Sequence, residues 1–307
     1  MRDAFFDEVY ALAQQDRNLM FLTADMGAFS LNRFKKDLPE QFVNVGVAEQ
    51  SMISIAAGLA LGGKRVFAYS IAPFATMRCY EQIKIDLCCM QLPVTIVGVG
   101  AGYMYGSDGP THHATQDIAV MRALPEITIL NPSDSTLTAA CARMAYHNPG
   151  PTYVRVEKGK LPLLYEDPQT DFSGGFAQLK HGADVTLIAT GIMVHRAHEA
   201  AAQLARASID AGIVDLYRLK PFQAERFLEA MRHAKKIVTL EENSLIGGLG
   251  SLVSEVLTDH AQTIPLKRIA AKDSHCYDYG EREWIHTRLG LDVESIVKEI
   301  ADWCLGG

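Results

Sequence analysis

Short apolar runs alternate with amphipathic stretches along the first half of the chain. The runs are apolar on both faces and end in polar or glycine-containing loops, as strands do in parallel sheets covered by helices on both sides. The pattern predicts strands at 19–23, 42–45, 66–69, 93–99, 127–130 and 153–156. It predicts helices at 3–16, 48–61, 74–90 and 133–146, the last with Ser133 as its N-cap. Ligands of such sheets bind at the carboxyl ends of the strands, so the loops after strands are where chemistry is expected.

The alternation stops between 157 and 182, where glycines and prolines interrupt it, and then begins again. We expect a first α/β domain at 1–160, a linker at 161–182 and a second, smaller α/β domain at 183–307. The predicted fold class is therefore α/β, with a doubly wound, mainly parallel sheet in the first domain. The second domain is expected to contain strands at 185–189, 213–216 and 237–240 and helices at 195–207, 223–233 and 250–259.

Composition narrows the possible partners of the chain. The chain has 36 acidic and 29 basic residues, and no Lys/Arg cluster of the kind that binds nucleic acid or a membrane surface. The first residues are acidic where a signal peptide would be apolar, and no uncharged apolar stretch is long enough to span a membrane. The six cysteines lack metal-ligand spacing. We therefore expect a cytoplasmic protein with buried thiols that acts on small molecules.

The first informative segment runs from Asn44 to Gln50 and precedes a helix of small residues. Glu49 lies at the start of that helix, where a solvated acid would be favoured by the helix dipole. The segment nevertheless resembles the strand-to-helix junction of the transketolase family, in which a buried glutamate meets the aminopyrimidine of thiamine diphosphate. The resemblance implies that Glu49 is catalytic and cofactor-binding.

Chemistry explains why an acid would be needed there. In an apolar pocket a carboxylic acid has a raised pKa and can share a proton with a ring nitrogen, which favours the imino tautomer of the cofactor. By the resemblance, that imino group then takes the proton of the thiazolium ring.

The second segment, 67–83, resembles the aromatic platform under the pyrimidine in the same family. Phe74 is the candidate for stacking on the ring, although aromatic residues at this spacing also occur in cores. Ile71 stands where the family usually has another aromatic residue. Ile71, Arg78 and Asp25, the last in a segment that resembles the family's Ser-Ala-Asp-Leu, are further candidates for contacts with the cofactor.

The third segment, from Tyr105 to Asp117, contains Ser-Asp-Gly-Pro-Thr-His-His. It closely resembles a loop shared by transketolases and deoxyxylulose-phosphate synthases. The resemblance implies that His112 binds the oxygen of the reacting carbonyl and moves protons, and that Asp108 selects a substrate hydroxyl. Adjacent histidines rarely ligate one ion, so a metal site at His112 and His113 is not expected.

Two basic residues follow the last strand of the first domain, where transketolases present an arginine to a sugar phosphate. Arg155 and Lys158 are therefore candidates for substrate binding, with Lys158 nearest that position. A lysine is a point charge rather than a planar fork, so recognition of a phosphate is less specific.

The resemblance continues beyond the linker. Residues 241–251, Glu-Glu-Asn-Ser-Leu-Ile-Gly-Gly-Leu-Gly-Ser, resemble a signature of the C-terminal domain of transketolases, and their glycines indicate tight helix packing. The Gly-Asp-Gly motif through which this family binds magnesium and the diphosphate is missing from the chain. We expect a separate subunit to hold the diphosphate of thiamine diphosphate through Mg²⁺, in an α2β2 heterotetramer.

Three functions fit these motifs. The first is a subunit of a split transketolase that transfers a two-carbon ketol unit from a ketose to an aldose. The second is the beta subunit of a 2-oxoacid dehydrogenase, or an enzyme similar to deoxyxylulose-phosphate synthase. The third is a degenerate subunit that only scaffolds a partner. The segment that contains Asp108 and His112 favours the transketolase over the dehydrogenase.

Overall fold

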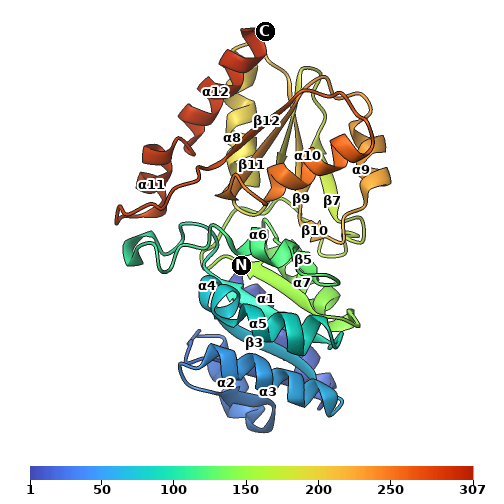
Figure 1. Ribbon diagram of the computed structural model, residues 1–307, viewed down its shortest axis with the longest axis vertical. Helices are drawn as coiled ribbons and strands as arrows, with labels where there is room; N and C mark the ends of the chain where they lie inside the picture. The colour runs from blue at the N-terminus through green and yellow to red at the C-terminus, as the bar shows by residue number, and fades with distance from the viewer. Residues whose placement is uncertain (307) are drawn as a thin grey trace. The chain divides into compact units, whose positions relative to one another are not determined.

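The computed structural model describes residues 1–306, and its contacts divide the chain into two compact units. The first unit comprises Met1–Ala101 and Val120–Thr170, and the second comprises Gly102–Ala119 and the chain from Asp171 onward. The short segment Gly102–Ala119 thus packs with the second half of the chain, which the sequence pattern did not indicate. Both units appear in Figure 1, and each is described by itself.

The first unit is built around a parallel sheet whose strands follow the order β5-β6-β4-β3-β1-β2. The strands are β1 (Leu19–Thr23), β2 (Phe42–Asn44), β3 (Arg65–Ile71), β4 (Val94–Val99), β5 (Thr128–Leu130) and β6 (Thr152–Val156). Strands β2 and β3 flank β1, so the loops after β1 and β3 diverge at a point where the strand order changes direction. Open parallel sheets bind ligands at such a point.

Helices cover both faces of this sheet (Figure 1). Helices α1 (Arg2–Gln15) and α7 (Ser135–His147) pack together on one face, and α3 (Glu49–Leu61) lies with the segments that follow β3 on the other. The remaining helical elements before β4 are α2 (Leu31–Asp37), η1 (Pro39–Gln41), α4 (Ala72–Ala75), η2 (Met77–Cys79), α5 (Tyr80–Gln82) and η3 (Ile83–Cys88). Every residue of β1, β4 and β6 is buried, as strands covered on both faces require.

The second unit contains a second, mainly parallel sheet of order β12-β11-β8-β9-β7, in which β7 alone runs antiparallel to its neighbour. Its strands are β7 (Phe176–Lys180), β8 (Val185–Ala189), β9 (Ala211–Leu216), β11 (Ile237–Ser244) and β12 (Leu266–Ala271), with the short β10 (Arg218–Lys220) after β9. Strand β7 lies inside the stretch that we expected to be a linker. Two mainly parallel sheets with helices confirm the predicted fold class.

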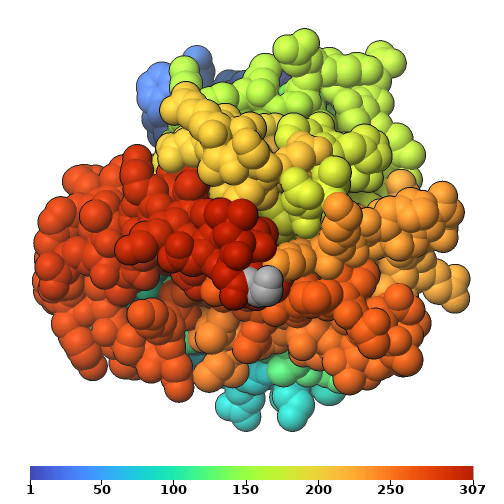
Figure 2. All heavy atoms as spheres, turned by 90° about the horizontal axis from the view of Figure 1, so that it is seen from above, coloured from blue at the N-terminus to red at the C-terminus, as the bar shows by residue number. Residues whose placement is uncertain are grey.

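Helices of the second unit lie on both sides of its sheet. Helix α8 (Met193–Arg206) packs against α12 (Val293–Leu305), which forms a deep red ridge in Figure 2. Helix α10 (Leu249–Asp259) lies along β11 and β12. The other helices are α9 (Ala224–Met231), α11 (Arg282–Leu289), the short 3₁₀ turn η4 (Gly106–Asp108) and α6 (Asp117–Arg122), which begins in this unit and ends in the first.

Two sequence predictions for the first unit were wrong. Asp134, not Ser133, is the N-cap of α7, since its side chain accepts a hydrogen bond from the Leu137 amide. The single helix expected at 74–90 is broken into α4, η2, α5 and η3. The Thr76 hydroxyl donates to the Ala72 carbonyl at 2.6 Å and the Cys79 thiol to the Phe74 carbonyl at 3.0 Å. Side chains that bond to helix carbonyls in this way compete with the regular ladder.

Candidate functional site

Glu49 begins α3, directly after the loop that follows β2, and its side chain is 3% exposed. One carboxylate oxygen, Oε2, accepts a hydrogen bond from Arg78 Nη1 at 2.7 Å. The other, Oε1, accepts from the Ser70 hydroxyl at 3.3 Å. A solvated helix-start acid is therefore excluded. The expectation of a purely apolar pocket was also wrong, because a guanidinium pairs with the buried carboxylate.

Arg78 connects this carboxylate to the aromatic residue expected beside it. Its guanidinium carbon lies 4.1 Å from the centroid of the Phe74 ring, and Phe74 is half-buried in α4. Three of the predicted site residues, Glu49, Phe74 and Arg78, thus meet in one cluster, which we call the acid cluster. A guanidinium over a ring face is attracted by the electron density of the ring, so Phe74 helps to hold Arg78 in place.

Two residues of the acid cluster were not predicted. Ser70, the penultimate residue of β3, donates to the acid, and the Cys79 thiol lies near it. Burial, with a further contribution from the negative charge of Glu49, raises the pKa of Cys79 to about 12. Cys79 is therefore a protonated thiol at neutral pH and does not act as a nucleophile.

Asp25 lies in the loop after β1 and is exposed. Its backbone has φ of 54°, a left-handed conformation that aspartate tolerates better than most residues. The Asn44 side chain holds this loop, because Asn44 Oδ1 accepts from the amides of Asp25 and Gly46, both at 3.0 Å. Asn44 Nδ2 also donates to Asp25 Oδ1 at 3.1 Å. Asn44 therefore ties together the loops after β1 and β2, a role that its place in the motif did not reveal.

The remaining candidates of the first unit differ in exposure. Ile71 ends β3, where it is half-buried and pairs in register with Val99. Arg155 is 3% exposed within β6, whereas Lys158, two residues beyond the strand, is exposed. Of these two cations, Lys158 is the one whose side chain faces solvent.

The segment that carries Asp108 and His112 belongs to the second unit. Asp108 ends η4 and is exposed, while His112 is half-buried with Nδ1 3.0 Å from the Thr111 hydroxyl oxygen. Gly109 between them has φ of 79°, which favours glycine. His113 is 4% exposed, and burial lowers its pKa below the ordinary value. The two adjacent histidines therefore differ: His113 is part of the packing, and His112 remains accessible.

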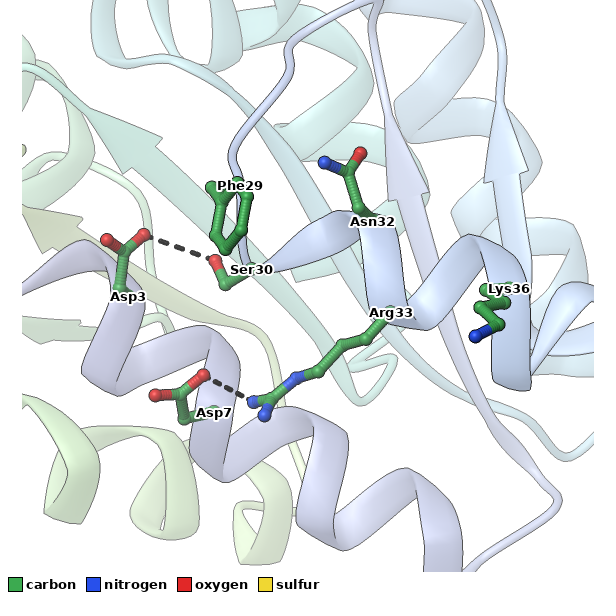
Figure 3. A pocket seen from close by; sticks show the side chains of 7 residues that line it. All are labelled: Asp3, Asp7, Phe29, Ser30, Asn32, Arg33 and Lys36. Carbon is green, nitrogen blue, oxygen red and sulfur yellow. Dashed lines mark hydrogen bonds and ion pairs between the residues drawn. The ribbon is translucent and has the colours of Figure 1, made fainter.

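Neither a metal cluster nor the pocket in Figure 3 coincides with these residues. Within residues 1–306, no group of three or more His, Cys, Asp or Glu side chains could hold a metal ion. Figure 3 shows a hollow of about 470 Å³ beside α1 and α2, with charged side chains at its walls and the exposed Phe29 ring at its edge. None of the predicted site residues lines it. Also within residues 1–306, no helix is both long enough and apolar enough to cross a membrane.

Comparison with known families gives matches to both halves of the chain. The family described as "Transketolase, pyrimidine binding domain" matches residues 1–162, and "Transketolase, C-terminal domain" matches residues 174–296.

Individual relatives match nearly the whole chain. One of the two chains of the apulose-4-phosphate transketolase of Phocaeicola vulgatus is 38% identical over 299 residues, which is 97% of this chain and 95% of that protein. A 6-deoxy-6-sulfo-D-fructose transketolase subunit of a Clostridium species is 36% identical, over 97% and 92% of the two chains. A solved structure described as a split gene transketolase, inactive beta4 tetramer, is 35% identical with a TM-score of 0.87 and covers 98% of this chain and 96% of that one.

Proposed function

Because the chain belongs to the transketolase family, we propose that it is the pyrimidine-binding subunit of a two-chain, thiamine-diphosphate-dependent transketolase. It would transfer a two-carbon ketol unit from a ketose donor to an aldose acceptor, a reaction of carbohydrate metabolism in the cytoplasm. The observation that carries the proposal is the buried carboxylate of Glu49 at the head of α3, beside the half-buried ring of Phe74.

The acid cluster fits an aminopyrimidine. A carboxyl group that is 3% exposed can exchange a proton with a ring nitrogen without competition from water, and an aromatic face can support a flat heterocycle. Thiamine diphosphate, when bound, supplies a carbon nucleophile for the ketose carbonyl. In the proposal Glu49 holds and moves the proton, Phe74 supports the ring, and Arg78, Ile71 and Asp25 complete the contacts with the cofactor.

Asp108 and His112 are the proposed substrate residues. His112 is half-buried and accessible, so it can donate a hydrogen bond to a carbonyl oxygen and pass a proton to and from it. Asp108 is an exposed acceptor for a substrate hydroxyl. Lys158, with its exposed ammonium, is the proposed contact for an anionic end of the substrate, and the buried Arg155 supports the strand from which it follows.

A second chain is part of this proposal. The chain lacks the Gly-Asp-Gly motif for magnesium and diphosphate. Relatives of similar length are named as transketolase subunits, and the similar solved structure comes from a split gene. These observations support a separate subunit that holds Mg²⁺ and the diphosphate, in an α2β2 heterotetramer.

Reconstitution tests the proposal directly. The purified chain mixed with its partner subunit, thiamine diphosphate and Mg²⁺ should transfer a ketol unit from hydroxypyruvate or a ketose to an aldose. Glu49→Ala and Glu49→Gln should each lower kcat by roughly 10² to 10⁴, the range typical of general acid–base groups. A Glu49→Ala enzyme with full activity would contradict the role of Glu49.

The same preparation separates the alternatives. Decarboxylation of pyruvate in preference to donation from hydroxypyruvate would favour a 2-oxoacid dehydrogenase subunit or an enzyme similar to deoxyxylulose-phosphate synthase. A complex that stays fully active after Glu49 and His112 are both replaced would favour a scaffold.

A further inference from the structure

The end of β11 lies against the segment that carries Asp108 and His112. We propose that Glu242, together with its partners His286 and Arg282, is a positioning residue that fixes residues 103–113, which we call the substrate loop. The inference rests on the proposed function, because it concerns the loop that presents His112 to the substrate. All the residues involved belong to the second unit.

Glu242 is almost completely buried and is surrounded by donors. Its Oε1 atom accepts from the Tyr103 amide at 3.1 Å and lies 2.7 Å from His286 Nε2 and 3.0 Å from Arg282 Nε. The side chain of Glu242 is 1% exposed and that of His286 is 0% exposed. A buried carboxylate in such surroundings has few alternative positions, so it fixes the backbone atom that it binds.

The other end of the loop is held by the same strand. The Ser244 amide donates to the Thr115 carbonyl at 2.6 Å. Between these two attachments, Gly102 and Ala114 exchange both of their backbone hydrogen bonds, at 3.2 and 2.8 Å, and so close the neck of the loop. The loop is thus a closed structure whose two ends are bonded to adjacent parts of β11.

Steric fit supports the same attachment. A Cβ atom on Gly102, whose φ is +55°, would lie 2.1 Å from Glu242 Oε2. A Cβ atom on Gly106 would lie 2.4 Å from the Gly280 carbonyl oxygen, and one on Gly109 would lie 2.6 Å from the Tyr279 ring. Glycine is therefore required where the loop contacts Glu242 and the segment before α11.

Glu241, the neighbour of Glu242, provides a matched control. Successive side chains of a strand point to opposite faces. Accordingly, Glu241 accepts from the amides of Leu249 and Gly250, at 2.7 and 2.8 Å, and caps α10 instead of binding the loop. Both glutamates are buried, and the same replacement can be made in each.

The experiment compares Glu242→Gln with Glu241→Gln in the reconstituted two-chain enzyme. The glutamine at 242 keeps the shape of the side chain but loses the charge that pairs with Arg282 and His286. We expect kcat to fall by about 10², the effect of a displacement of catalytic groups by roughly 1 Å, while the apparent Kd for thiamine diphosphate stays within about twofold. Glu241→Gln should leave kcat within about twofold.

Hydrogen exchange of the peptide that covers the substrate loop gives a readout that does not depend on activity. In Glu242→Gln, exchange at the Tyr103 amide should be at least about tenfold faster than in the wild type, and in Glu241→Gln it should be unchanged. His286→Asn serves as a second variant, with the same expected direction, in case Glu242→Gln does not fold.

The outcomes separate this inference from the proposed function. Unchanged kcat and unchanged exchange in Glu242→Gln, or equal losses in both glutamate variants, would overturn the positioning role. A wild-type complex without ketol transfer would contradict the proposed function, and the exchange measurement would still decide whether Glu242 holds the loop.

Discussion

At the scale of single residues, the carboxylate of Glu49 is held unequally. Arg78 binds one of its oxygens at 2.7 Å, while the second oxygen has only the longer contact to Ser70 at 3.3 Å. The second oxygen is therefore the one better able to accept a new partner. Arg78, stacked on Phe74, sets the orientation of the acid without occupying both of its oxygens.

We predict that Arg78→Ala weakens the binding of thiamine diphosphate by about tenfold, or roughly 1.4 kcal/mol, because the acid loses its fixed orientation. Arg78→Lys should lose less, since a lysine keeps the charge but not the planar fork. The apparent Kd, measured by titration of the reconstituted complex, checks this. An Arg78→Ala enzyme with wild-type affinity would show that the ion pair does not prepare the site.

His113 makes the stability of the second unit depend on pH. Burial lowers its pKa below the ordinary value of 6.5, more than the hydrogen bond with the Gly106 backbone and the charge of Glu242 raise it. Below that pH the unfolded chain binds a proton that the folded chain does not, so the free energy of unfolding falls as the pH drops. His198 has a pKa shifted in the same direction by burial.

Accordingly, His113→Asn should reduce the loss of stability between about pH 7.5 and about pH 5, because one of the groups that take up a proton on unfolding is gone. Urea denaturation at several pH values measures it. The same pH dependence in wild type and variant would argue against a depressed pKa of His113.

At the scale of elements, Asp134 connects α7 to the segment after β6. Its Oδ1 atom caps the helix through the Leu137 amide at 2.8 Å, and its Oδ2 atom accepts from the amides of Leu164 and Tyr165, at 2.8 and 2.9 Å. Asp134 is completely buried. One side chain therefore satisfies the helix end and two further amides.

Asp134→Ala should lower the free energy of unfolding by about 2 to 4 kcal/mol, the sum of a lost N-cap and buried amides without acceptors. Ser135→Ala at the first residue of the helix, by comparison, should change it by less than about 0.5 kcal/mol. Chemical denaturation of both variants provides the test, and equal stabilities would mean that the cap contributes little.

Most elements of the parallel sheets could be predicted, because their runs of buried apolar residues are short and lie between loop signals. Strand β1 ends where its pattern does. The edge strand β7 has alternating burial and follows a glycine pair, so it did not stand out from a linker. The helices α11 and α12 lie beyond the last predicted element, and α11 has a weakly amphipathic sequence.

The predicted site residues were found through motifs, and their partners needed the fold. Glu49 and Phe74 stand out in their segments, but the bond from Arg78 across 29 positions depends on how β3 and α3 pack. Glu242 lies 139 positions from Tyr103, whose amide it binds. Contacts over such separations cannot be inferred from spacing along a single sequence.

At the scale of the whole molecule, α3 has no charged residue after Glu49 and yet is not fully buried. Ile55 is 41% exposed and Leu61 is 62% exposed, although a helix that is apolar all round is usually enclosed. The relative of known structure is described as a tetramer of beta chains that is inactive. This helix is thus a candidate surface for association between chains.

We predict that the chain purified alone forms a homo-oligomer without ketol transfer, and that Ile55→Glu shifts it toward smaller species because a charge is placed on an apolar contact. Sedimentation velocity measures the change. Leu163→Glu replaces an exposed leucine outside this helix and should leave the size unaltered. An Ile55→Glu protein of wild-type size would place the contact elsewhere.

The attachment of the substrate loop to β11 also matters for engineering. A chimera that imports residues 103–113 from a relative with another donor specificity would meet a foreign strand end at Glu242 and Ser244, and a foreign surface at Tyr279. Such a graft should work only when the donor's strand end and the turn before α11 are transplanted with the loop. The exchangeable cassette of this enzyme therefore consists of three pieces that are far apart in the gene.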